Sequence, residues 1–77
     1  MKFSDYFRHT RTRPDRKNIE IKWIEAAYTY PDRESVQSDG RVRRWKYISE
    51  VDKFLRIVVL EDNETVHNAF FDRSFKN

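Results

Sequence analysis

The sequence predicts a two-layer α+β domain in which one or two N-terminal helices pack on a four-stranded antiparallel β-meander. Three observations support this fold class. Apolar residues recur at helical spacing between Asn18 and Tyr30, β-favouring residues follow Pro31, and turn-forming residues separate the predicted strands. A chain of 77 residues has room for one domain, which we expect to span residues 1–77.

The first predicted element is a short helical turn near the N-terminus. Ser4 is a suitable N-cap for residues 5–8, because its hydroxyl can accept a hydrogen bond from a free backbone N–H. Pro14 ends this turn at the latest, since a proline disfavours helical geometry in the residue before it.

The main helix is expected to begin after Asn18, the predicted N-cap, and to end before Pro31. One apolar stripe follows the helical period and consists of Ile19, Trp23, Ala26, Ala27 and Tyr30. A second apolar group falls on roughly the opposite side and consists of Ile21, Ile24 and Tyr28. The helix therefore needs a second cover, which is either residues 1–16 or a partner protein bound to Ile21, Ile24 and Tyr28.

Four strands are predicted after Pro31. Asp39-Gly40 lies between residues 34–38 and 41–49 and predicts a type I′ hairpin. Residues 54–60 are the most apolar stretch and predict a central strand. The acidic residues 61–64 predict a tight turn, after which residues 65–71 return antiparallel.

The length of this last turn decides which side chains share a face. A two-residue loop at Asp62-Asn63 predicts the pairs Val58–His67, Arg56–Ala69 and Phe54–Phe71. Arg56, His67 and Arg73 then project to one face. The helix-facing set consists of Leu55, Ile57, Val59, Val66, Asn68 and Phe70. A three-residue loop would move every side chain of the last strand to the opposite face, which would separate Arg56 from His67.

The strand predicted over residues 41–49 is rich in cations. Its alternation places Arg41, Arg43, Trp45 and Tyr47 on one face and Val42, Arg44, Lys46 and Ile48 on the other. Clustered cations neutralise phosphates, and aromatic rings stack on unpaired bases. We therefore predict a nucleic-acid-binding group of Arg41, Arg43, Arg44, Trp45 and Lys46. The alternative is a solvated strand face with one core tryptophan.

Composition limits the chemistry that the chain can perform. The absence of cysteine excludes disulfides, thiolate nucleophiles and Cys-ligated zinc, and it suits a reducing cytoplasm. One glycine cannot form a Gly-rich phosphate loop. No apolar run has the length of a signal sequence or a membrane span, so we expect a soluble cytoplasmic protein. We expect no metal and no cofactor.

The remaining candidate residues suit cleavage of RNA, in which the substrate supplies its own 2′-hydroxyl nucleophile. Arg56 and Arg73 can hold phosphate oxygens bidentately, and His67 is the evident acid or base. The structural alternatives are a half-buried strand histidine at His67 and a surface ion pair between Asp72 and Arg73.

The order of elements and the residues of the last hairpin resemble the RelE/ParE toxin superfamily. The similar segment runs through residues 55–59, an acidic turn and residues 65–73. The N-terminal part, with His9, Arg13, Arg16 and a helix closing at Tyr30-Pro31, is similar to the small BrnT-like branch, which includes a bacterial domain of unknown function.

The resemblance implies the toxin of a type II toxin–antitoxin pair. Such a toxin is a small ribonuclease that acts on mRNA and is neutralised by a cognate antitoxin encoded by an adjacent gene. The resemblance also implies that Arg56 and Arg73 match site arginines and that His67 lies where some members hold a catalytic side chain. The alternative function is a non-catalytic module whose basic sheet face binds RNA or an acidic partner protein.

Overall fold

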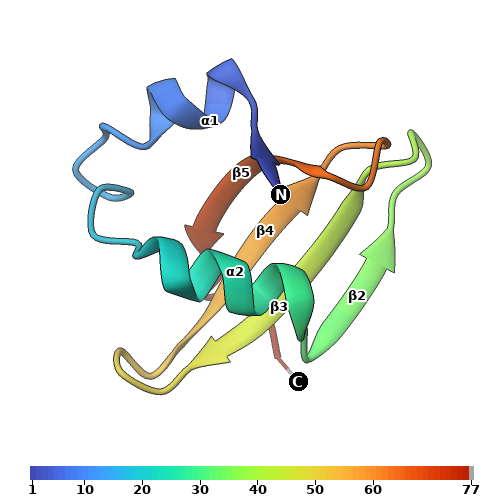
Figure 1. Cartoon of the computed structure of the whole chain (residues 1–77). Helices are drawn as coiled ribbons and strands as arrows, with labels where there is room; N and C mark the ends of the chain where they lie inside the picture. Colours follow the sequence, from blue (N-terminus) through green and yellow to red (C-terminus); the bar gives the residue numbers. More distant parts are fainter. Residues whose placement is uncertain (77) are drawn as a thin grey trace.

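A computed structural model describes residues 1–76 and contains two helices and one mixed five-stranded sheet. The elements in chain order are β1 (Lys2–Phe3), α1 (Asp5–Thr10), α2 (Ile21–Thr29), β2 (Arg33–Val36), β3 (Val42–Ile48), β4 (Lys53–Val59) and β5 (Thr65–Phe71). The strand order is β1-β5-β4-β3-β2. Helix α2 crosses one face of the sheet (Figure 1), which we call the helix face, and the opposite side is the open face.

The predicted α+β class is confirmed, but the predicted four-stranded antiparallel sheet is wrong. Strands β2 to β5 form the expected antiparallel meander. The additional strand β1 pairs parallel with β5 through Lys2↔Thr65 and Phe3↔Val66. Two residues are too few to produce a detectable alternation, so β1 left no periodic signal in the sequence.

The N-terminal helix forms as predicted and is longer than expected. The Ser4 hydroxyl accepts a hydrogen bond from the backbone N–H of Phe7 at 3.1 Å, and α1 continues to Thr10. Helix α2 begins at Ile21 instead of after Asn18, with Glu20 at the N-cap position. The backbone N–H of Ile19 donates to Arg16 in a preceding turn, which keeps Ile19 outside the helix.

Helix α2 has one buried side, and the prediction of two apolar faces is wrong. Its buried residues are Trp23, Ile24 and Ala27. Ile24 is completely buried, which contradicts its predicted role in partner binding. Tyr30 is 73% exposed. The predicted stripe failed because Ile19 precedes the helix, so the true apolar side lies between the two predicted groups.

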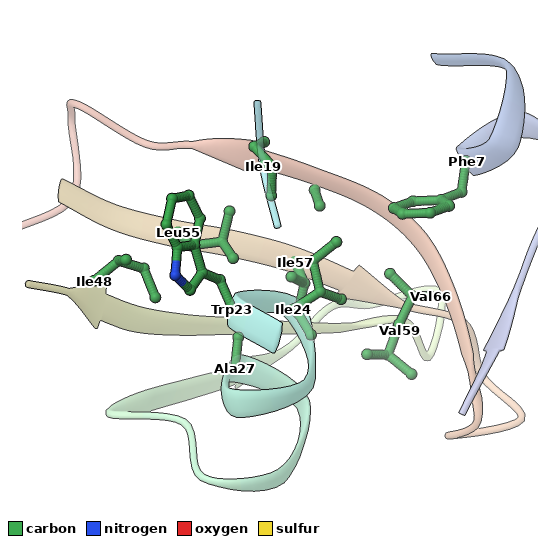
Figure 2. Packing of buried hydrophobic residues seen from close by; sticks show 11 residues of the cluster. Phe7, Ile19, Trp23, Ile24, Ala27, Ile48, Leu55, Ile57, Val59 and Val66 are labelled. Carbon is green, nitrogen blue, oxygen red and sulfur yellow. The ribbon is translucent and has the colours of Figure 1, made fainter. Parts of the chain in front are cut away.

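The hydrophobic core lies between α2 and the helix face of the sheet (Figure 2). Phe7 of α1 packs in this core beside Val66. The N-terminal segment therefore covers part of the core, which agrees with the first of the two predicted covers, residues 1–16. Ile21 and Tyr28, the other predicted partner-binding residues, are partly buried against this core. The Tyr28 hydroxyl also donates a hydrogen bond to the carbonyl of Asn63 at 2.9 Å.

The β2–β3 hairpin does not have the predicted type I′ turn. The backbone N–H of Gln37 donates to Arg41 at 2.7 Å, and that of Gly40 donates to Gln37 at 3.0 Å. Gly40 has a φ of 90°, whereas Asp39 keeps a negative φ. A type I′ turn needs positive φ at both central residues, so the observed connection is a three-residue loop with glycine in the left-handed position.

The predicted register of β4 and β5 holds next to the turn, at Val59↔Val66, and is wrong beyond it. The observed pairs are Leu55↔Phe71, Arg56↔Phe70, Ile57↔Ala69 and Val58↔Asn68, followed by Val59↔Val66. The shift between Val58 and Val59 is a β-bulge, in which His67 is the extra residue. Asn68 and Phe70 therefore lie on the open face, opposite to the prediction, while Ala69 and Phe71 lie on the helix face.

Candidate nucleic-acid interface

A row of two cationic and five aromatic side chains crosses the open face. The Cζ atom of Arg16 lies 5.3 Å from the centre of the Phe70 ring. The Cζ atom of Arg56 lies 5.1 Å from the centre of the same ring and 5.7 Å from the centre of the Trp45 ring. Trp45 stacks on Phe75 at 4.7 Å, and edge contacts continue the row to Phe54 and then Tyr47. We call this row the cation–aromatic ladder. Its members are Arg16, Phe70, Arg56, Trp45, Phe75, Phe54 and Tyr47.

Trp45 is the buried centre of the ladder. Only 7% of the residue is exposed, and it lies outside the main core cluster. Its indole N–H donates to Asp72 at 3.1 Å, and the Phe75 ring covers it at an interplanar angle of 16°. These contacts agree with the alternative that Trp45 is a packed core residue, here on the open face. Tyr47, which is 41% exposed, is the solvent-facing end of the ladder.

Arg56 is held inside the ladder by a carboxylate. Its Nη1 lies 3.6 Å from Asp72 Oδ2, and its Nε is buried without a hydrogen-bond partner within residues 1–76. Burial alone would raise the pKa of Asp72, but hydrogen bonds from Ser74 and Trp45 hold this pKa below its usual value. Asp72 therefore stays ionised, and Arg56 is already partly neutralised before any phosphate approaches.

Two of the predicted nucleic-acid-binding cations lie on the helix face. Arg44 is 9% exposed and donates to Glu34 at 2.8 Å, to the Tyr28 carbonyl at 3.1 Å and to Asn63 at 2.9 Å. Lys46 lies 3.5 Å from a carboxylate oxygen of Asp32. The structure therefore contradicts a phosphate-binding role for Arg44, whose donors are satisfied inside the protein.

The open face carries two arginines that have no acidic partner. Within residues 1–76, no carboxylate lies within 4.0 Å of Arg33 or Arg43. Arg33 pairs directly across from Trp45, so it shares the face of Arg43. Arg41 lies 3.7 Å from Asp39 in an exposed ion pair. Sequence reasoning missed Arg33, because the predicted two-residue turn would pair it with Lys46 on the other face, whereas the observed three-residue loop pairs it with Trp45.

His67 lies in the bulge at the β1 side of the sheet. Its Nδ1 is 2.9 Å from the Ser4 hydroxyl, and its ring stacks on Tyr6 at 4.7 Å. Burial is the main cause that lowers the pKa of His67, and the positive charge of Arg41 acts in the same direction. The imidazole is consequently neutral near pH 7 and can accept a proton.

The structure does not bring the three predicted catalytic residues together. His67 lies near the start of β5, Arg56 lies in the middle of β4, and the exposed Arg73 lies beyond the end of β5. Arg73 makes no ion pair with Asp72 within 4.0 Å among residues 1–76, so the predicted surface pair is not formed. The three side chains thus mark three places along the sheet instead of one active centre.

Residues 1–76 contain neither a cluster of metal-ligating side chains nor a helix of membrane-spanning character. No group of three or more histidine or acidic residues there could hold a metal ion. None of the helices in this part of the chain is long and apolar enough to cross a bilayer.

Comparison with known proteins adds no assignment. No family model, curated protein or solved structure matches the chain. The relationship to the RelE/ParE toxins therefore stays a prediction from the sequence.

Proposed function

We propose that the protein binds single-stranded RNA through the open face of its sheet. The observation that carries this proposal is that Arg33 and Arg43, which have no carboxylate within 4.0 Å among residues 1–76, share the open face with the exposed Tyr47 end of the ladder. Unpaired cations gain most from a phosphate backbone, because binding releases condensed counterions. Exposed rings accept bases of any sequence by stacking.

The geometry favours a path for the strand along β3. Arg43, Trp45 and Tyr47 point to the same face at successive alternate positions, and Arg33 lies beside Trp45. Phosphates would lie over the two arginines, and a base would stack on the exposed Tyr47 ring. Single-stranded RNA fits better than a duplex, because only unpaired bases can present their rings to a side chain.

Fluorescence anisotropy with a labelled oligouridine tests this proposal. The double variant Arg33→Gln/Arg43→Gln should bind about tenfold or more weakly and should show a salt dependence reduced by about two phosphate contacts. Arg8→Gln/Arg13→Gln is the matched control, since it removes the same two charges from exposed positions outside the sheet. Equal affinity of the double variant and the control would refute binding through the open face.

Catalysis is a second candidate function, and the environment of His67 favours it. The Ser4 hydroxyl fixes the imidazole, whose lowered pKa leaves it able to accept a proton from a 2′-hydroxyl. The 2′-oxygen would then attack the adjacent phosphorus and expel the 5′-oxygen, which takes a proton from water as the P–O5′ bond breaks, and the cleaved end carries a 2′,3′-cyclic phosphate. Arg41 is the nearby cation that could stabilise charge on the phosphate.

This second candidate is the toxin ribonuclease that the resemblance implies. It requires a cytoplasmic protein whose cognate antitoxin is encoded by an adjacent gene. Induced expression should stop growth, and His67→Gln should restore it without weakening RNA binding by more than about twofold, since a base in the chemical step need not contribute to binding. RNA that stays intact, with growth unaffected by wild-type protein, would leave binding alone as the function.

A further inference from the structure

A cavity of about 500 Å³ opens at the end of the sheet opposite to His67. It lies between the segment that precedes α2, the start of β4 and the end of β5. Its charged lining consists of Asp15, Arg16, Lys53 and Arg73, and its apolar lining includes Trp23 and Phe71. The volume falls in the range of about 300–1,000 Å³ that is typical of small-molecule sites.

The charge of this cavity is positive and largely uncompensated. Asp15 is the acidic residue of the lining, and its Oδ2 lies 3.4 Å from Arg16 Nε. Lys53 and Arg73 have no carboxylate within 4.0 Å among the residues that the structure describes. Two cations that face one cavity without acidic partners favour an anion there.

Arg16 forms a wall of the cavity and is bonded to β5. Its Nη1 donates to Asn68 Oδ1 at 2.6 Å, and its guanidinium lies over the Phe70 ring at 5.3 Å. Only 15% of its side chain is exposed, although it comes from a segment without regular secondary structure. This side chain joins the segment before α2 to β5.

An inorganic anion would make no use of the apolar lining of the cavity. The rings of Trp23 and Phe71 lie 6.1 Å apart at 57°, and Lys53 Nζ lies 5.4 Å from the centre of the Phe71 ring. A cation is thus in contact with the aromatic wall. A ligand that carries a phosphate and a planar ring would use both parts of the lining.

We infer that this cavity binds a nucleoside 5′-monophosphate unit, with its phosphate at Lys53 and Arg73 and its base against the partly exposed Phe71 ring, beside the buried Trp23. The unit is either a free nucleotide or the 5′-phosphorylated end of an RNA strand. The site is separate from Arg33 and Arg43, so it does not depend on RNA binding by the open face.

Calorimetric titration of the full chain with AMP tests the inference. AMP should saturate one site per chain and bind more tightly than either inorganic phosphate or adenosine. The double variant Lys53→Gln/Arg73→Gln should bind AMP at least about tenfold more weakly, because it loses both charged partners of the phosphate. Arg8→Gln, which lies outside the lining, should keep the wild-type affinity.

Three results would overturn the inference. They are the absence of saturable AMP binding, equal AMP affinity in the double variant, and equal affinities for AMP and inorganic phosphate. A second readout comes from the Trp45→Phe variant, in which Trp23 is the remaining tryptophan and its fluorescence should change with AMP. Tighter binding of a 5′-phosphorylated dinucleotide than of AMP identifies an RNA end as the ligand, and the reverse order identifies a free nucleotide.

Discussion

Replacement of Arg44 by methionine should be one of the most destabilising single changes in this protein. The guanidinium joins three parts of the fold, since it donates to Glu34 of β2, to the Tyr28 carbonyl at the end of α2 and to Asn63 in the acidic turn. It also lies 5.1 Å from the centre of the Tyr28 ring. Methionine keeps most of the apolar stem and removes all of these polar contacts.

The magnitude follows from how exposed each partner is. Hydrogen bonds from a charged donor to neutral acceptors contribute about 1.5–3 kcal/mol each, but the two bonds to Tyr28 and Asn63 are not additive. The Glu34 side chain is 47% exposed, so water screens its ion pair, which adds no more than about 1 kcal/mol. Together these contributions predict a loss of about 2–4 kcal/mol.

Urea denaturation followed by tryptophan fluorescence measures this loss. Glu34→Gln is the matched control and should cost less than about 1 kcal/mol, because it retains an acceptor and removes only the screened charge. Arg44→Met in the Glu34→Gln background should still cost more than half of its effect in the wild type. A loss below about 0.5 kcal/mol for Arg44→Met would refute the argument that buried donors tie these three elements together.

Three further changes test other parts of the structure. Gly40→Ala should destabilise the protein by about 1–2 kcal/mol in the same assay, because φ at this position is 90°, and an unchanged urea midpoint would contradict the observed loop. Phe75→Ala should uncover Trp45 and shift its emission to longer wavelength, with a loss of about 0.5–1.5 kcal/mol from the aromatic pair. The Asp62 pKa is lowered to about 2, mainly by its hydrogen bond from Thr65, so its stabilising effect is complete above the unfolded pKa of 3.8 and is lost as the pH falls towards 2. Asp62→Asn should therefore flatten the acid side of the stability curve between these values, and an unchanged acid transition would contradict the assignment.

The elements that were predictable from the sequence are those with strong local signals. Ser4 caps α1 because a serine hydroxyl can satisfy a free N–H within the same turn. The chain leaves α2 before Pro31, and the strands from β3 to β5 follow alternating or continuous apolar patterns. The alternation of Arg43 and Trp45 against Arg44 and Lys46 was likewise predictable, since successive side chains of a strand point to opposite faces.

What the sequence could not supply depends on contacts between distant segments. Strand β1 forms because Lys2 and Phe3 pair with the free edge of β5, and no local pattern encodes this pairing. The burial of Arg44 depends on Glu34, Tyr28 and Asn63 meeting from three elements. The start of α2 was misplaced because Ile19 is as apolar as a helical core residue, although it packs from the preceding turn.

The bulge at His67 has the largest effect on function, because one extra residue reverses the faces of everything that follows it in β5. Without it, Phe70 would point towards α2, and Arg56 would lack one of the two rings that enclose it. With it, Phe70 connects Arg56 to Arg16, which in turn forms a wall of the cavity beside Arg73. The bulge therefore gives the open face its continuous ladder. It also separates His67 from Arg56 and Arg73, the two arginines of the predicted catalytic set. A sheet arranged in this way is better suited to holding RNA along its length than to concentrating three catalytic groups on one phosphate, and this is why binding is the stronger of the two proposals.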